Sequence, residues 1–296
     1  MQDQRTRSYL MLIGSMLIFG TIGIFRRFIP LSSALLAFTR GILGSAALLL
    51  FTALRGGCGL KSLRGRTLAL LFLTGGLIGL NWILLFEAYN ATTVATATLC
   101  YYMEPTFVIL LSPIFFREKL GAKKLFCAAL SLIGMAFVSG IVEGGIPPIS
   151  ELRGVLLALG ASVLYASVVI LNKKLDMENA YAQTIVQLFA AAVVIAPYLA
   201  VTEELSAYRL DALSIVMIVI VGLLHTGVAY ALYFASMNRL SAQSVSVLGY
   251  IDPVSALLLS ALILRERMTI FGAVGAVLII GSALLSELSP RKRVRR

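Results

Sequence analysis

Charged residues and histidine are scarce in this sequence, and their scarcity argues against most classes of enzyme. Only 13% of the 296 residues are charged, and only one is histidine. The chain contains no P-loop, no nucleophile-elbow motif and no pair of histidines with zinc-ligand spacing. We therefore expect a protein that is not an enzyme, that uses no ATP directly and that needs no cofactor or metal.

Cysteine is rare as well. The three cysteines are Cys58, Cys100 and Cys127, and they form no CxxC or other metal-ligand pattern. We interpret all three as small packing residues, because an unpaired cysteine in apolar surroundings behaves as a small hydrophobic side chain.

Apolar residues, in contrast, make up most of the chain. The hydrophobic share is 59% and the mean hydropathy is +0.94, which is more apolar than soluble domains of this size. A membrane-spanning helix needs about 20 apolar residues. Runs of this kind cover residues 8–25, 31–54, 67–88, 92–116, 121–141, 153–172, 181–201, 211–237, 241–264 and 268–287. We predict an all-α integral membrane protein with ten transmembrane helices, the first of them retained rather than cleaved as a signal peptide.

Lysine and arginine gather on one side of these predicted spans. The loops on the side of the two termini carry 18 of the 25, and the loops on the opposite side carry 6. Basic loops face the cytoplasm, so both termini are expected there. The net charge of +11 follows from this topology, and the basic segment 291–296 is expected to contact anionic membrane lipid rather than nucleic acid.

One acidic pattern occurs twice, in the middle of two apolar runs. Residues 101–105 read Tyr-Tyr-Met-Glu-Pro, and residues 249–253, 148 positions later, read Gly-Tyr-Ile-Asp-Pro. The proline in each is expected to bend its helix. The chain thus divides into units 1–146 and 147–296 of five helices each. Because five is odd, the second unit is inverted in the membrane, which is typical of alternating-access carriers with a site at the bilayer midplane.

Several short motifs resemble one transporter family. They are Phe38-Thr39-Arg40-Gly41, Glu104-Pro105-Thr106-Phe107 with Arg117-Glu118-Lys119-Leu120, and Asp252-Pro253 with Arg265-Glu266-Arg267-Met268. With these motifs the chain resembles the ten-helix EamA type of the drug/metabolite transporter superfamily. The resemblance implies a carrier of small metabolites in the bacterial inner membrane, often an exporter of amino acids or related compounds.

The chain departs from the family pattern in two places. A tryptophan that is common in the first helix of each unit is replaced here by Phe19 and Tyr165. A glycine that usually precedes the glutamate at the end of the acidic helix is replaced by Arg117 and Arg265. The first departure bears on the shape of the substrate pocket, and the second on the membrane interface.

Four ionisable residues lie well inside the predicted spans: Arg40, Glu104, His225 and Asp252. Charged groups at this depth are costly and usually face a cavity, a partner or a substrate path. We expect Glu104 and Asp252 to carry a coupling proton or to neutralise an amino group of the substrate; the alternative is a structural bond to a facing helix. Arg40 is expected to pair with Glu104, or else to hold a substrate carboxylate. His225 is expected to pack within the bundle, with a proton relay as the alternative.

Aromatic residues also lie within the spans, away from the interfaces where they usually gather. They are Phe19, Trp82, Tyr102, Tyr165, Tyr230 and Tyr250. Aromatic walls next to carboxylates suit an amine through cation–π contact or an aromatic amino acid through stacking, whereas the simpler interpretation is packing of the bundle. Asn81, next to Trp82, is a candidate for orienting a polar group of the substrate.

These observations predict a secondary transporter of small metabolites, most of all an exporter of amino acids or related amines. It would work by alternating access around a midplane site, with protons as the candidate coupling ion. The alternatives are an importer of a quaternary amine such as choline and a membrane scaffold that transports nothing. A monomer and a homodimer are both compatible with the sequence.

Overall fold

The computed structural model of the protein describes residues 2–57, 60, 63, 65–116, 121–144, 148–175, 179–204, 208, 210–237, 240, 245 and 248–287. All regular secondary structure in these residues is helical. Seven helical segments are long and apolar enough to cross a membrane, and two shorter apolar helices occupy residues 251–263 and 270–286. The prediction of an all-α membrane fold is therefore confirmed.

The first half of the chain crosses the fold five times. Two of the crossings are interrupted, because α1 is followed directly by α2 and α5 by α6. The helices are α1 (Gln2–Gly20), α2 (Ile22–Arg27), α3 (Ser33–Ala53), α4 (Gly65–Ala91), α5 (Val94–Tyr101), α6 (Glu104–Phe116) and α7 (Ala122–Val138).

The one-turn helix α8 (Ile141–Gly144) leads towards the second half. There the third crossing is built from α11, a π-helical turn η3 and α12 in succession. The helices are α9 (Ile149–Leu175), α10 (Ala180–Thr202), α11 (Ala212–Gly222), η3 (Leu223–Val228), α12 (Ala229–Met237), α14 (Ile251–Ile263) and α15 (Ile270–Glu287).

Polar side chains fix the starts of four helices. Ser32, Thr93, Asn179 and Asp211 each accept a hydrogen bond from the backbone N–H three positions further on. The first N–H groups of a helix have no partner within the helix, so such caps stabilise its first turn. These caps set where each crossing begins.

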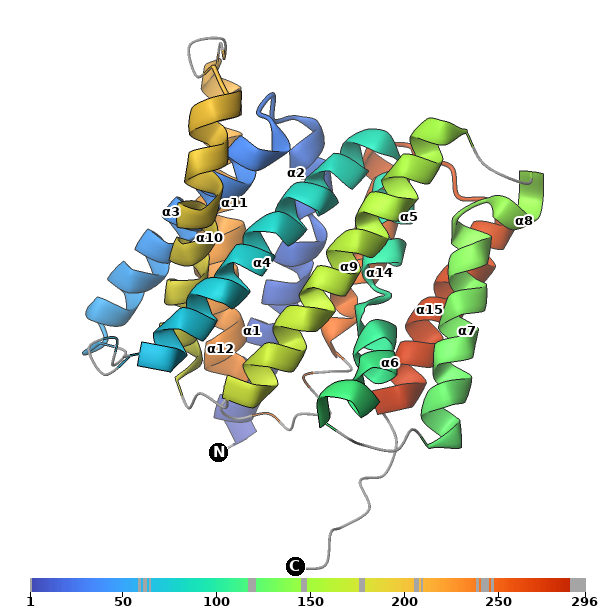
Figure 1. Ribbon diagram of the computed structural model, residues 1–296, viewed down its shortest axis with the longest axis horizontal. Coiled ribbons are helices and arrows are strands. Elements are labelled where there is room, and N and C mark those ends of the chain that lie inside the picture. The colour runs from blue at the N-terminus through green and yellow to red at the C-terminus, as the bar shows by residue number, and fades with distance from the viewer. Residues whose placement is uncertain are drawn as a thin grey trace, which may run out of the picture.

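The two halves run in opposite directions. In Figure 1, α1 starts at the lower end, where the N-terminus lies, whereas α9 starts at the upper end, near α8. Helix contacts repeat across the halves as a two-fold relation requires: α4 packs on α9 as α1 packs on α12, while α3 packs on its counterpart α10 and α7 on α15. Each half therefore completes the packing of the other.

Small residues allow the closest of these helix contacts. A Cβ atom on Gly134 of α7 would lie 2.8 Å from the carbonyl oxygen of Gly275 of α15, and one on Gly275 would lie 2.6 Å from that of Gly134. Nearby, Ser131 and Ser282 share a hydrogen bond between their hydroxyl groups. Membrane helices associate through such close backbone approach, because lipid provides little hydrophobic drive.

Some features expected from the sequence fall outside the described residues. They are the Arg117-Glu118 pair, the start of the ninth predicted span at residues 241–244, the basic segment 291–296 and the boundary between residues 146 and 147. The division into units 1–146 and 147–296 therefore stays a prediction.

Candidate functional site

A central cavity of about 500 Å³ lies among helices of both halves. Its wall includes Asn172 in the last turn of α9, Gln183 in the first turn of α10 and Phe234 in the last turn of α12. In Figure 1 the last turn of α9 lies at the same end of the fold as the N-terminus. Nine residues singled out from the sequence line it: Phe19, Arg40, Trp82, Tyr102, Glu104, Tyr165, Tyr230, Tyr250 and Asp252. Residues far apart in the chain are thus brought to one space.

The acidic wall is built where two helices begin. Glu104 is the first residue of α6, and Asp252 is the second residue of α14. The N-terminus of a helix carries partial positive charge, which favours a carboxylate there. Tyr102, at the end of α5, donates a hydrogen bond of 2.6 Å to Oδ2 of Asp252. Glu104 and Tyr165 line the same cavity.

The prolines of the acidic pattern lie in first turns rather than at bends. α5 ends at Tyr101 and α6 begins at Glu104, so the span is broken where the sequence predicted a bent helix. Pro105 and Pro253 then occupy positions whose N–H groups would have no partner within the helix. The break places Glu104 at a helix start.

Arg40 forms a separate basic wall. Its Nε atom donates a hydrogen bond of 2.8 Å to Oγ1 of Thr226 in η3, and its Cζ atom lies 4.1 Å from the centre of the Trp82 ring. The expected ion pair with Glu104 is not formed between these two described residues. The ring and the hydroxyl hold the guanidinium instead, by cation–π attraction and a hydrogen bond. Its Nη1 and Nη2 atoms form no hydrogen bond within the described part of the chain, although the residue lines the cavity.

Aromatic rings surround the space between these walls. Phe19 lies 5.2 Å from Tyr230 between ring centres, in an edge-to-face arrangement. Tyr102 lies 6.5 Å from Tyr250 across the two halves. Tyr101 lies 5.8 Å from Tyr165. Such contacts contribute packing energy beyond the buried area and leave ring faces and hydroxyl groups at the wall.

Asn81 and His225 do not belong to this cavity lining. Asn81 is fully buried and donates from Nδ2 to the carbonyl oxygen of Ala161 on α9. His225 is also fully buried; its Nε2 atom lies 2.7 Å from Oγ1 of Thr21, and its ring lies 4.8 Å from that of Phe25. Both residues join helices.

Other lining residues were not among the site residues predicted from the sequence. They include Tyr89, Thr98, Tyr101, Asn172, Gln183, Gln187 and Tyr233. Tyr101 was detectable, because it precedes Tyr102 at the helix break. Asn172 and Gln183 could not be identified as lining residues from the sequence, because polar residues near the end of a span are common at the membrane interface.

The family of the chain follows from comparison with known proteins. The model of the EamA-like transporter family matches residues 6–140 and again residues 152–288. The chain belongs to the EamA-like transporter family. The two matches follow one another along the chain.

Two relatives of this EamA-like transporter have names that refer to transport. The uncharacterized transporter YxxF of Bacillus subtilis is 27% identical over 96% of this chain and 90% of its own length. A protein of Escherichia coli named a probable amino-acid metabolite efflux pump is 26% identical over 67% of this chain and 68% of its own length.

A solved crystal structure shares the fold of this EamA-like transporter. It superposes with a TM-score of 0.66 at 21% sequence identity and covers 95% of this chain and 96% of its own. The likeness therefore extends over both halves and concerns the arrangement of the helices.

Proposed function

We propose that this EamA-like transporter is a secondary carrier of small zwitterions or amines, foremost amino acids, which works by alternating access. The observation that carries the proposal is that one cavity holds Arg40 on one wall and the carboxylates of Glu104 and Asp252 on another. A free amino acid presents a carboxylate and an ammonium group, which are complementary to these two walls.

Each wall has a role in this proposal. The Nη1 and Nη2 atoms of Arg40 donate a bidentate pair of hydrogen bonds to the substrate carboxylate, and Trp82 holds the guanidinium in place. Glu104 receives the ammonium group or a coupling proton. Tyr102 keeps Asp252 oriented towards the cavity. The remaining tyrosines surround the substrate side chain.

Export is the proposed direction, and the bacterial inner membrane is the proposed location. The described cavity wall extends towards the end where the N-terminus lies, and the charge bias assigns that end to the cytoplasm. Uptake of substrate from the cytoplasm fits this arrangement. The efflux-pump name of one relative supports the same direction.

Binding of a quaternary amine such as choline is the second candidate. The tyrosine-rich wall next to two carboxylates favours it, because aromatic faces attract such cations. Arg40 argues against it, since a fixed positive charge in the same cavity repels a substrate that has no carboxylate.

Counterflow in proteoliposomes tests both candidates. The purified protein is reconstituted with a pH-sensitive dye, and amino acids, polyamines and choline are supplied in turn. We expect exchange of amino acids with proton movement, and loss of the proton movement in Glu104→Gln or Asp252→Asn. Exchange of choline alone would support the second candidate. No exchange of any of these substrates would overturn the proposal and favour a membrane scaffold.

A further inference from the structure

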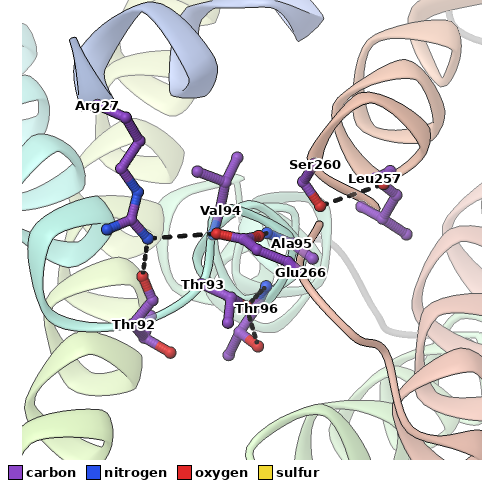
Figure 2. Close-up of polar contacts among 9 residues, drawn as sticks. All are labelled: Arg27, Thr92, Thr93, Val94, Ala95, Thr96, Leu257, Ser260 and Glu266. Carbon is purple, nitrogen blue, oxygen red and sulfur yellow. Dashed lines mark hydrogen bonds and ion pairs between the residues drawn. The ribbon is translucent and has the colours of Figure 1, made fainter. Parts of the chain in front are cut away.

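Glu266 joins the second half of the chain to the first at the end of the fold opposite the N-terminus. Its Oε1 atom accepts a hydrogen bond of 3.0 Å from the backbone N–H of Val94, and its Oε2 atom accepts one of 3.3 Å from that of Ala95. Arg27 lies 3.3 Å from Oε1 and donates to the carbonyl oxygen of Thr92 at 2.8 Å. Figure 2 shows these contacts meeting at the N-terminus of α5.

Glu266 contributes more to this junction than Arg27 does. Its side chain is 12% exposed, against 33% for Arg27. A carboxylate that accepts two backbone N–H groups at a helix start is stabilised by charge-assisted hydrogen bonds and by the partial positive charge of that end. The ion pair with Arg27, whose side chain is partly exposed, is weakened by water and salt.

The turn that ends α14 directs Glu266 towards α5. Arg265 has a φ of 55°, in the left-handed region that favours glycine. The N–H groups of Leu264 and Glu266 both donate to the carbonyl oxygen of Ser260, which closes the helix end. Figure 2 shows the chain turning from Ser260 to Glu266 beside the start of α5. A strained residue is thus retained next to the contact between the halves.

Buried residues fill the space between this junction and the cavity. Thr98 lines the cavity, one turn of α5 away from the capped residues. Val94 and Leu99 are almost fully buried within this part of α5. A Cβ atom on Gly23 would lie 2.5 Å from Cγ1 of Val94, so α2 packs directly against the capped turn. Buried side chains at the capped start of α5 therefore lie one helical turn from the cavity lining.

The helices α5 and α14 are held together at both ends. Glu266, just beyond α14, caps the start of α5, and Tyr102 at the end of α5 bonds Asp252 at the start of α14. The two helices also contact each other along their length. Asp252 in the cavity is therefore connected to Glu266 at the junction through the single helix α14.

We propose that Glu266 is the residue that closes this end of the transport cavity, by capping α5, and that loss of the cap opens it. The inference rests on the proposed transport function, because alternating access requires one end to be closed by contacts that can break. The group that binds the N-terminus of α5 is the side-chain carboxylate of Glu266.

Pulsed-EPR distances across the junction test the proposal. Spin labels are attached at Phe28→Cys and Ile270→Cys, which are 52% and 83% exposed and lie in different halves. The background has Cys58, Cys100 and Cys127 replaced by alanine. We expect one short distance in this background. In Glu266→Ala we expect the ratio of the population with a longer distance to the population with the short distance to rise by about tenfold, because a charged helix cap is lost. Glu266→Gln should shift less, since its amide oxygen still accepts one N–H.

Two further variants separate the cap from the ion pair. In the exchange Arg27→Glu with Glu266→Arg, opposite charges are restored, but arginine cannot accept the N–H groups of Val94 and Ala95. We expect this double variant to stay open, and a closed distance would overturn the assignment of the cap. Glu143→Gln removes an exposed acid at the same end of the fold and should leave the distance unchanged.

The distances are measured without substrate, so they are independent of the proposed substrate class. A longer spin-label distance in Glu266→Ala, together with no exchange of any substrate by the wild-type protein, would reject the transport proposal and keep the closing contact. Exchange of amino acids together with an unchanged distance in both Glu266→Ala and Glu266→Gln would reject the closing contact and keep the transport proposal. Gel filtration of each variant verifies that the labelled protein is folded and monodisperse.

Discussion

The two halves of this EamA-like transporter share a fold but present different chemistry at equivalent positions. Arg40 on α3 and Gln187 on α10 are 147 positions apart in the sequence, and both line the cavity. Arg40 places a charge over Trp82, whereas Gln187 donates neutral hydrogen bonds of 2.7 Å to Thr74 and to Asn172. The repeat thus provides matched positions, and single residues decide the charge at each of them.

The acidic positions differ in a similar way. Glu104 is the longer acid and the first residue of α6, whereas Asp252 is the second residue of α14 and accepts a hydrogen bond from Tyr102 of the other half. A cavity between identical halves would present the same groups to both ends of a substrate. The difference between the halves is therefore what suits the cavity to a molecule with two unlike ends.

Removing the charge of Arg40, which distinguishes the two halves, should have the largest effect on substrate binding. Arg40→Gln makes the two halves alike at this position, and we expect the affinity for amino acids to fall by about 30-fold, because a bidentate charged contact is lost. The affinity for amines without a carboxylate should not fall. Competition in the counterflow assay measures both.

Arg153→Gln is the matched control, because it removes an exposed arginine at the start of α9. An equal loss of affinity for amino acids and for amines in Arg40→Gln would mean that Arg40 stabilises the fold rather than binding a carboxylate.

Loss of the junction between the halves should have the next largest effect. In Glu266→Ala we expect the rate of amino acid exchange to fall by about tenfold, because the closed state at that end is depopulated. Initial exchange rates at saturating substrate give the measurement, with Glu143→Gln as the control. Wild-type exchange rates in Glu266→Ala would show that closure at this end does not limit transport.

The bond between Tyr102 and Asp252 should have a smaller effect. Tyr102→Phe removes one hydrogen bond between the halves, and we expect the rate of amino acid exchange to fall by about fivefold. Tyr101→Phe is the matched control, because the Tyr101 hydroxyl has no hydrogen-bond partner in the described part of the chain. Equal losses in the two variants would indicate a general effect of losing a tyrosine hydroxyl from the cavity.

The smallest expected effect concerns the turn at the end of α14. Arg265→Gly relieves the left-handed conformation and should raise the free energy of unfolding by about 1 kcal/mol. A melting curve of the purified protein would show a rise of about 2 °C. Arg267→Gly serves as the control, because a glycine outside such a conformation adds only chain flexibility. A lower melting temperature in Arg265→Gly would mean that the Arg265 side chain stabilises the turn.

The glycine that usually stands at position 265 now has a physical explanation. The resemblance to the family marked Arg265 as a departure that bears on the membrane interface. The structure places this residue in the backbone region for which glycine is favoured, directly before Glu266. The resemblance to the family indicated the residue type that is usual at this position, but the contact between Glu266 and the start of α5 required the fold.

The sequence by itself determined the membrane class and the helical crossings, because runs of about 20 apolar residues can be satisfied in lipid only as helices. It also singled out nine residues that line one cavity, since charged and aromatic residues in the middle of a span are unusual. Only the tertiary structure decided that Arg40 lies over Trp82 instead of pairing with Glu104, and that Asn81 and His225 join helices outside the cavity. Those outcomes depend on how each helix is rotated about its axis. Rotation is set by contacts between residues far apart in the chain, which a pattern within one span does not contain.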